Sequence, residues 1–395
     1  MTGNPNPPVE AGHVTSTRIL MLCDWLPPDF GAVGQYATGF AQRLAQEGAH
    51  VVLVGFSSTA SSRTLEPMGA GRLHTIRIRQ RTMDRASLLR RALWTLSANL
   101  ALLWGARREL LHCDEIRFTG SPAYLLHFVM PVASVLGVRT RYRITDFHPE
   151  CLIAARRRKS WWLRLLGGVT NAWRRRVDVI EVLGDDQRRR LLDCGVAPER
   201  MELLRDDAPV AIDPLATPAP TPPALAGHKT LLYSGNWGEA HDHETFIEGY
   251  RLFTQARPGE VGLWLNATGK RVPAIVSALE RLGLPFAHTP TVPLAQLAGV
   301  LCAADIHLIT LDDRFVGYVM PSKVYGCIAS GRPVLFVGSA DSDVHALCRD
   351  RLRPECYRRV STGDSAGLAS ALADLLQCGR PGARIGNIPA TEIEQ

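Results

Sequence analysis

Short apolar runs alternate with helical patterns from the start of the chain. Arg18–Cys23 is an apolar run that ends in a polar, Pro-rich loop. The apolar positions of Gln35–Glu47 recur at helical spacing up to Gly48, and His50–Phe56 is the next apolar run. Two apolar runs joined by a helix are typical of parallel strands with a crossover connection. The pattern therefore predicts an α/β unit here.

The same pattern returns after residue 228. Thr230–Tyr233 is an apolar run, Ser234–Gly238 is a glycine-containing loop, and His243–Phe253 has an amphipathic helical pattern that leads to another run at Val261–Leu265. Segment 211–228 is rich in Pro and Ala and lacks periodicity, which is typical of a linker. We predict an α/β fold with two doubly wound, Rossmann-like domains facing a cleft. Each has a glycine-containing loop at the carboxyl end of its first strand, where such sheets bind ligands.

These patterns also set the expected domain limits. The first domain spans 17–210 and the second spans 229–378, while the polar ends, 1–16 and 379–395, are expected to be disordered. Phe118–Val138 carries no formal charge and is long enough to span a membrane. Its Pro residues and a Gly predict instead a loop followed by a shorter, buried helix.

Composition narrows the class of protein. The chain has 395 residues, 46% of them hydrophobic and 21% charged, which excludes a disordered chain. Lys and Arg number 45 against 38 Asp and Glu, and this +7 fits nucleic acid, an anionic membrane or a phosphate-bearing substrate. Nine Cys without a C-x-x-C pair indicate reduced thiols. The N-terminus lacks a signal-peptide pattern, so we expect a cytoplasmic protein.

The strongest cluster of cations lies in the first domain. Between residues 156 and 176, eight Lys and Arg flank Trp and Leu. This pattern is typical of a segment that docks on anionic lipid, and also of nucleic-acid binding, but no nucleic-acid motif accompanies it. We expect peripheral docking on the inner face of the cell membrane, and no nucleic-acid partner. A solvated helix face over core tryptophans is the alternative. The expected docking residues are Arg156, Arg157, Arg158, Lys159, Trp161, Trp162, Arg174, Arg175 and Arg176.

A second candidate site lies where a helix is expected to begin near Pro321. Gly317, Ser322 and Lys323 cluster there, and Gly331 ends the helix. Backbone N–H groups and a cation at a helix start suit a diphosphate. Neither glycine loop matches the dinucleotide or P-loop motif. The alternative is an ordinary turn followed by a solvated lysine.

His241–Glu244 contains two His, an Asp and a Glu, all of which can bind metal. Acidic residues at a helix start are also stabilised by the helix dipole, so we predict no metal site there. Contact of one of these histidines with phosphate is the alternative.

Five motifs together resemble GT-B glycosyltransferases of family 4, in the order found in that family. The resemblance covers roughly residues 17–378, and the most similar members take part in capsule, O-antigen and exopolysaccharide assembly. The motifs are Leu26–Ala32, Thr145–Glu150, Leu231–Gly238, Ala303–Leu311 and the Pro-Ser-Lys-x-Tyr run that continues to Val334.

The resemblance implies a retaining enzyme that moves a sugar from a nucleotide diphosphate-sugar, UDP-sugar being expected, to a hydroxyl of a lipid-linked or glycan acceptor. It implies no further cofactor. The leaving diphosphate would be stabilised by protein groups. Gly31 and Gly34 would face the diphosphate, Asp146, His148 and Glu150 would face the acceptor, and Asp146 and Lys323 would be catalytic. The expected donor-binding residues are Gly235, Asn236, Lys270, Arg271, Gly317, Tyr318, Ser322 and Lys323.

Two departures from the family pattern leave alternatives open. Tyr318 and Gly326 stand where the family has the two glutamates of Glu-x7-Glu, and Lys270 with Arg271 would replace basic residues that the family places after the Gly235 strand. A retaining reaction needs no separate base, and an N-cap role is the alternative for Asp146. A non-hydrolysing UDP-sugar epimerase and a non-enzymatic basic module that binds membrane or nucleic acid are the alternative functions.

Overall fold

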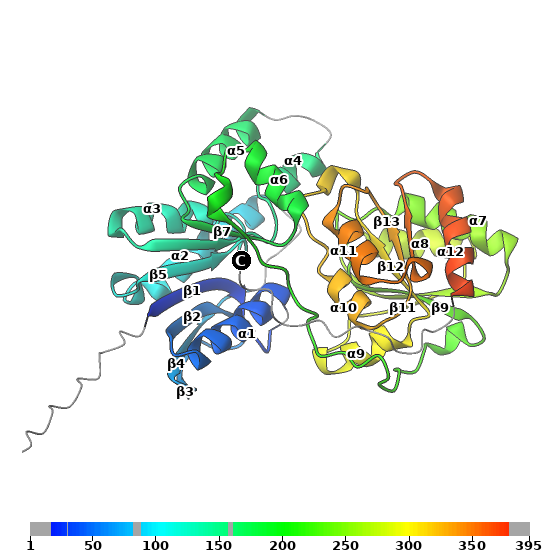
Figure 1. The fold of residues 1–395 in the computed structure, drawn as a ribbon, viewed down its shortest axis with the longest axis horizontal. Helices are drawn as coiled ribbons and strands as arrows, with labels where there is room; N and C mark the ends of the chain where they lie inside the picture. Colours follow the sequence, from blue (N-terminus) through cyan, green and yellow to red (C-terminus); the bar gives the residue numbers. More distant parts are fainter. Residues whose placement is uncertain (1–16, 30, 82–87, 157–160, 379–395) are drawn as a thin grey trace, which may run out of the picture. The chain divides into compact units, whose positions relative to one another are not determined.

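The computed structural model describes residues 17–29, 31–81, 88–156 and 161–378. The ends predicted to be disordered, 1–16 and 379–395, lie outside the described residues. The predicted α/β class is confirmed, since the chain forms two Rossmann-like sheets flanked by helices (Figure 1). By its internal contacts the chain divides into two compact units, residues 1–141 and 142–395.

The first sheet has eight strands in the order β3-β4-β2-β1-β5-β6-β7-β8. β1 is parallel to β2 and to β5, and only the pairing of β3 with β4 is antiparallel among the ladders described. The strands are β1 (Arg18–Trp25), β2 (His50–Ser57), β3 (Ser62–Met68), β4 (Gly71–Arg79), β5 (Glu115–Thr119), β6 (Arg139–Arg143), β7 (Val179–Val182) and β8 (Met201–Leu203). The helices are α1 (Ala32–Gln46), α2 (Leu88–Ala106), α3 (Leu126–Leu136), α4 (Glu150–Ala155), α5 (Trp161–Arg174) and α6 (Asp185–Asp193).

The predicted crossover at the start of the chain is confirmed. β1 and β2 run parallel, and α1 connects them. Ala37, Ala41 and Ala45 repeat every four residues and are fully buried against the sheet. Small side chains at this spacing let the helix approach the strands closely. Gly48, at φ +107, adopts the left-handed conformation that ends α1.

The second sheet has six strands in the order β11-β10-β9-β12-β13-β14, and all five ladders are parallel. The predicted unit after residue 228 is therefore confirmed. The strands are β9 (Lys229–Asn236), β10 (Val261–Thr268), β11 (Phe286–Thr289), β12 (Ile306–Thr310), β13 (Val334–Val337) and β14 (Tyr357–Val360). The helices are α7 (Glu244–Ala256), α8 (Val272–Arg281), α9 (Leu294–Ala303), α10 (Lys323–Ala329), α11 (Asp343–Arg351) and α12 (Ser365–Gln377).

Apolar clusters cover both faces of this second sheet. α7, α8 and α12 pack on one face around Trp237, Phe246 and Tyr250, and α10 and α11 pack on the other around Phe336 and Val344 (Figure 1). A parallel sheet buried on both faces explains why its strands appear as continuous apolar runs. The carboxyl ends of β9, β10, β12 and β13 then meet at one edge, where the loops carry polar residues.

The apolar segment Phe118–Val138 divides largely as predicted. Phe118 and Thr119 end β5, a loop follows, and α3 forms the shorter helix, whose Leu126, Val129 and Met130 are buried. Pro131 does not end the helix but lies inside it, because packing of the apolar face compensates for the missing N–H. Among the described residues, no helix has the length and apolarity that a membrane crossing requires.

The segment predicted as a linker, 211–228, has no helix or strand apart from one short 3-10 turn at Pro223–Leu225. It nevertheless packs on the second sheet. Leu225 is buried beside Leu232 and Trp264, and the Ala219 N–H donates to the Gly299 carbonyl. Segment 211–228 is therefore an irregular connection that packs on the second sheet along part of its length.

Candidate functional site

A buried lysine faces Gly235 near the end of β9, which extends to Asn236 and so includes the first residues of the loop predicted at Ser234–Gly238. The Lys323 Nζ lies 3.3 Å from the centroid of the Tyr233 ring. Gly235 is next to it, since a Cβ added there would lie 4.0 Å from Nζ. The Lys323 Nζ is buried and has no hydrogen-bond partner among the described residues. Among the described side chains, an ammonium in this position contacts the Tyr233 ring and has no hydrogen-bond acceptor, so its three N–H donors remain for a ligand.

The electrostatics at this lysine disfavour a second positive charge. Burial lowers the pKa of Lys323 to about 7. Burial and then the nearby Lys323 lower the pKa of His241 to about 3, and the His241 Nδ1 lies 2.6 Å from the Thr310 carbonyl oxygen. His241 is thus a neutral, structurally bound imidazole at pH 7. A buried cation without a counter-ion favours an anionic ligand.

The backbone near the end of β9 requires glycine at position 235. Gly235 has φ +122, which residues with a Cβ rarely adopt. Asn236 is exposed and its carbonyl accepts from the Tyr233 hydroxyl at 3.0 Å. Gly269 leaves room for this turn, since a Cβ there would come within 2.6 Å of the Trp237 carbonyl. Two of the predicted donor residues, Gly235 and Lys323, are therefore adjacent. The position that a Cβ would take at Gly235 faces the Lys323 side chain.

The other predicted cations of the donor site already have a partner. The Glu239 carboxylate accepts from Lys270, and from the Arg271 guanidinium at 2.6 Å. The hydrogen bond from Lys270 lowers the pKa of Glu239, and Arg271 adds to this effect. Glu239 thus compensates one of the two positive charges. The sequence did not indicate this pairing, because Glu239 follows β9 whereas Lys270 and Arg271 follow β10.

The predicted acceptor and donor residues meet at one backbone bridge. Asp146 pairs with Val319 as an isolated antiparallel bridge, and the Phe147 N–H donates to the Tyr318 carbonyl at 3.0 Å. Asp146 is exposed as a residue, but desolvation of its carboxyl raises the pKa of that group, with His148 opposing this effect. Within the second unit, the loop after β6 therefore lies against the segment that precedes α10.

Gly317 and Tyr318 pack on α6. Gly317 has φ +75, and a Cβ there would lie 2.7 Å from the Asp186 carbonyl oxygen. The Arg190 guanidinium lies 4.6 Å from the centroid of the Tyr318 ring. Ser322 is exposed and makes no capping hydrogen bond. Gly317 and Tyr318 therefore have clear packing roles, and Ser322 is available to a ligand.

The structure changes the roles expected of Glu150 and Arg174. Arg174 is fully buried and forms an ion pair with Glu150, with NH1 donating to Oε1 at 2.5 Å. It also donates to the His148 carbonyl at 3.2 Å. Burial opposes its charge, but the Glu150 carboxylate outweighs burial and raises the pKa of Arg174. The prediction that Arg174 docks on lipid is wrong, because this arginine lies in the interior.

The other predicted docking residues surround α5. Trp161 is 77% exposed and Trp162 42%, and the Arg156 guanidinium lies 5.5 Å from the centroid of the Trp162 ring. Arg175 and Arg176 are exposed at the end of the helix. Leu163 and Thr170 are buried on the inner side of α5. Three of the predicted docking residues, Arg157, Arg158 and Lys159, lie outside the described residues.

The glycine loop of the first unit has a different construction. A Cβ at Gly34 would lie 1.7 Å from the Trp25 carbonyl oxygen, so only glycine allows α1 to begin against β1. Gly31 has extended backbone at φ −178 and space for a Cβ. Beneath the loop, the Asp24 Oδ2 accepts from the Ser121 hydroxyl at 2.6 Å, while its Oδ1 is buried with no partner among the described residues.

The structure also tests the residues considered for metal. Within the described part of the chain, no group of three or more His, Cys, Asp or Glu is arranged to hold a metal ion. His241 binds a backbone carbonyl, as above, and burial raises the pKa of Asp242.

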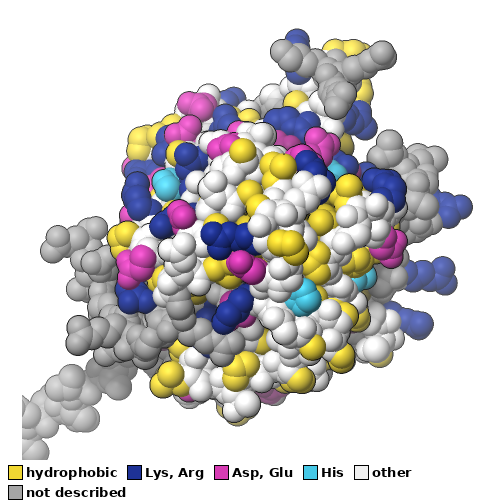
Figure 2. Space-filling model, turned by 90° about the vertical axis from the view of Figure 1, so that its right-hand side faces the viewer, with side chains coloured by type: hydrophobic (Ala, Val, Ile, Leu, Met, Phe, Trp, Pro, Cys, Tyr) yellow, Lys and Arg dark blue, Asp and Glu magenta, His cyan; other side chains and the backbone are white. Residues whose placement is uncertain are grey.

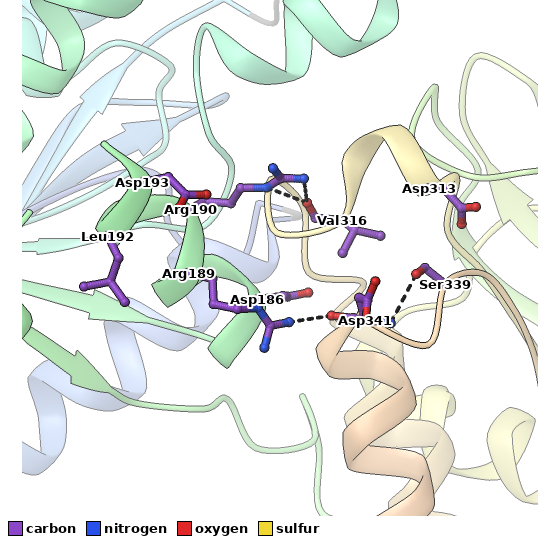
Figure 3. A pocket seen from close by; sticks show the side chains of 9 residues that line it. All are labelled: Asp186, Arg189, Arg190, Leu192, Asp193, Asp313, Val316, Ser339 and Asp341. Carbon is purple, nitrogen blue, oxygen red and sulfur yellow. Dashed lines mark hydrogen bonds between the residues drawn. The ribbon is translucent and has the colours of Figure 1, made fainter. Parts of the chain in front are cut away.

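A cavity of about 520 Å³ lies between α6 and the loops that follow β12 and β13 (Figure 3). Its arginines are engaged, since Arg189 donates to the Asp341 carbonyl at 2.7 Å and Arg190 to the Val316 carbonyl at 3.1 Å. Four carboxylates outnumber these two cations, so the cavity does not favour a diphosphate. Its lining residues are Asp186, Arg189, Arg190, Leu192, Asp193, Asp313, Val316, Ser339 and Asp341.

With two Rossmann-like sheets and a buried cation at the loop after β9, the chain has the fold of GT-B-type glycosyltransferases. No family model matches it. One curated relative is a probable glycosyltransferase, WbjE of Pseudomonas aeruginosa, 22% identical over 250 residues. That match spans 59% of this chain and 60% of the relative.

Solved structures match over a larger share of the chain. The UDP-forming α,α-trehalose-phosphate synthase of Burkholderia vietnamiensis has a TM-score of 0.61 at 14% identity, with 92% of each chain covered. Sucrose-phosphate synthase of Thermosynechococcus elongatus has a TM-score of 0.62 at 14% identity, covering 91% of this chain and 90% of that one. HepE of Anabaena, solved with UDP and glucose, has a TM-score of 0.59 at 12% identity, covering 92% and 89%. At these identities the likeness establishes the fold.

Proposed function

We propose that the protein is a glycosyltransferase that moves a sugar from a nucleotide diphosphate-sugar to a hydroxyl. The observation that carries this proposal is the buried, unpartnered Lys323 Nζ beside Gly235. The fold supports it, because its structural neighbours include UDP-forming and UDP-bound enzymes. A UDP-sugar is therefore the proposed donor, and Gly235, Asn236 and Ser322 are proposed to contact its diphosphate.

In the proposed mechanism, Lys323 stabilises the charge that develops on the leaving diphosphate. The ammonium is protonated when the donor binds, because an anion beside it raises its pKa from about 7. As the sugar–phosphate bond breaks, negative charge grows on the phosphate oxygen, and a fixed, buried cation stabilises that charge without reorganisation. Protein groups then carry the role that a metal ion has in other transferases.

The proposed reaction retains the configuration at the anomeric carbon, as the resemblance to family 4 implies. The acceptor hydroxyl attacks from the face that the diphosphate leaves, and a phosphate oxygen takes its proton. Asp146 is exposed beside Val319 and is proposed to orient that hydroxyl. Glu150 is not needed for this step, since Arg174 holds it.

The acceptor is proposed to be lipid-linked, and the protein to dock peripherally on the inner face of the cell membrane. Support comes from α5, whose Trp161 and Leu165 are 77% and 64% exposed next to Arg156 and Arg164. Amphipathic segments with tryptophan and arginine bind anionic lipid surfaces. The resemblance to enzymes of surface-polysaccharide assembly favours the same acceptor class.

Thermal unfolding with a panel of nucleotides tests the proposal. UDP is expected to raise the melting temperature of the wild-type chain and to have little effect on Lys323→Met, while Lys229→Met, an exposed lysine on β9, serves as the matched control. No shift with any nucleoside diphosphate would contradict the proposal. Incubation with several nucleotide sugars and a lipid extract, analysed by mass spectrometry, then identifies the sugar and the acceptor. Transfer is expected to persist in EDTA.

A further inference from the structure

Helix α2 is apolar on two opposite sides. Its inner side consists of Ala98, Leu102 and Ala106, which are fully buried. At Gly105 the helix approaches β4 so closely that an added Cβ would collide with Ile78. These positions repeat every four residues and account for the attachment of α2 to the first sheet.

The opposite side of α2 carries four large apolar residues that remain exposed, which we call the outer stripe. Leu93 is 57% exposed, Leu96 48%, Leu100 51% and Trp104 70%. Their spacing of three, four and four residues places them on one face of the helix. Four such side chains in a row form a continuous apolar surface, which in a soluble domain indicates a binding surface.

Cations flank both ends of the outer stripe. Arg90 and Arg91 are exposed before it, Arg107 and Arg108 are exposed after it, and the sequence from 85 to 108 contains no Asp or Glu. The Arg107 guanidinium lies 4.4 Å from the centroid of the Trp104 ring. This arrangement combines apolar insertion with attraction to anionic headgroups.

The surface over α7 and α12 provides a contrast. There Lys and Arg are interspersed with Asp and Glu (Figure 2), and Arg251 pairs with Glu248 while Arg358 pairs with Asp374. Surface cations with acidic neighbours are solvated and do not attract an anionic surface. Around the outer stripe, Arg residues outnumber acidic ones, since residues 85–108 contain no Asp or Glu and Glu109 follows Arg108. This excess of positive charge favours an anionic lipid membrane over a typical protein partner.

We propose that the outer stripe of α2 docks on an anionic lipid membrane. Leu100 and Trp104 enter the headgroup–acyl boundary, and the flanking arginines bind lipid phosphates. The outer stripe shares no residue with the docking segment proposed at α5. The role that we give it, bringing the enzyme to a lipid-linked acceptor, rests on the proposed function. Membrane binding itself does not depend on the proposed function, because it is argued from the exposure of the stripe and the charge around it.

Vesicle sedimentation tests the docking. The full chain is expected to bind equimolar phosphatidylcholine–phosphatidylglycerol vesicles and to bind phosphatidylcholine vesicles far less. The double variant L100S/W104S is expected to lose about 100-fold in vesicle affinity, because two large side chains no longer leave water. R107Q/R108Q is expected to lose about 30-fold, on anionic vesicles only. The controls are Leu65→Ser and Arg63→Gln, exposed positions on β3.

Quenching by brominated acyl chains assigns the docking to one helix. Trp104→Phe is expected to reduce the quenching of tryptophan fluorescence, whereas unchanged quenching in Trp104→Phe with a loss in Trp161→Phe would overturn the role of α2. Undiminished vesicle binding by L100S/W104S would also overturn it, as would a dimer in sedimentation velocity that this variant dissociates.

A UDP thermal shift measured on the same proteins separates the two proposals. Vesicle binding without a UDP-induced shift in melting temperature would support the proposed membrane surface and contradict the proposed transferase activity. A UDP shift without docking would do the reverse.

Discussion

Each sheet has a glycine-containing loop after its first strand, and the two loops differ in what the glycine permits. In the first unit, glycine is required at position 34 because α1 packs closely on the Trp25 carbonyl. In the second, Gly235 supplies a positive φ, and a Cβ there would lie in van der Waals contact with the Lys323 side chain. A glycine at a strand–helix joint therefore does not by itself indicate a ligand.

The buried charges at the two loops have opposite signs. Asp24 lies at the end of β1 with one carboxylate oxygen unpartnered, and Lys323 faces the end of β9 with its ammonium unpartnered. Burial raises the pKa of Asp24, against the hydrogen bond from Ser121, and lowers the pKa of Lys323 to about 7. A cation suits a diphosphate better than a carboxylate does, which is why we propose the phosphate site at Gly235 and Lys323 and not at the first loop.

Lys323→Met is expected to separate function from stability. Transfer should fall by about 100- to 1,000-fold, since one preorganised charge on the leaving group is lost. The free energy of unfolding should rise by up to about 5 kcal/mol at pH 6 and by about 2 kcal/mol at pH 9, because the wild-type lysine is costly to bury when protonated.

The sign of this stability effect follows from the depressed pKa of Lys323. Between pH 7 and 10.5 the unfolded state binds more protons, so the contribution of Lys323 to stability improves as the pH rises through this range. Steady-state kinetics and urea unfolding at both pH values measure the two effects, with Lys229→Met as control. A variant that is inactive and also less stable would make Lys323 a structural residue.

Gly34→Ala tests the packing role of the first loop. The added Cβ would lie 1.7 Å from the Trp25 carbonyl oxygen, so α1 must move, and we expect a loss of about 3 kcal/mol in the free energy of unfolding. Gly31→Ala is the matched control, expected to change stability by less than about 0.5 kcal/mol because its backbone is extended. Denaturant titration compares them, and equal stabilities would remove the distinction between the loops.

UDP affinity should depend on pH through Lys323. Only the protonated amine attracts the diphosphate, so affinity should fall about tenfold per pH unit above pH 7, or about 1.4 kcal/mol per unit. Calorimetric titration of the wild type between pH 6.5 and pH 8.5 measures this dependence, which amounts to about 1.4 decades because affinity levels off below pH 7. In Lys323→Met the slope should vanish, and a slope of the same size in this variant would assign the titration to another group.

The sequence predicted strands and crossovers well because apolar runs and helical spacing reflect burial directly. It predicted Lys323 as a donor residue from the cluster of Gly317, Ser322 and Lys323 at a helix start, and the family motif agreed. Its burial against Tyr233 depends on two segments that are far apart in the chain. Arg174 was grouped with its basic neighbours, although its spacing from Leu163 and Thr170 places it on the inner face of α5. Treating consecutive basic residues as one cluster leaves out this helical periodicity, which decides which of them face solvent.

Asp24→Asn should produce the smallest effect and the opposite dependence on pH. A raised carboxyl pKa means that the folded state holds its proton more tightly, so the charged form costs stability once the pH exceeds that pKa. Asparagine keeps an acceptor for the Ser121 hydroxyl without the charge, and a gain of about 0.5–1 kcal/mol is expected at pH 7, with none at pH 3. Ser121→Ala should instead lower stability at pH 7. Unfolding measured against pH would thus show Asp24 more costly at high pH and Lys323 at low pH, and two profiles of the same sign would contradict the opposite charges assigned to the loops.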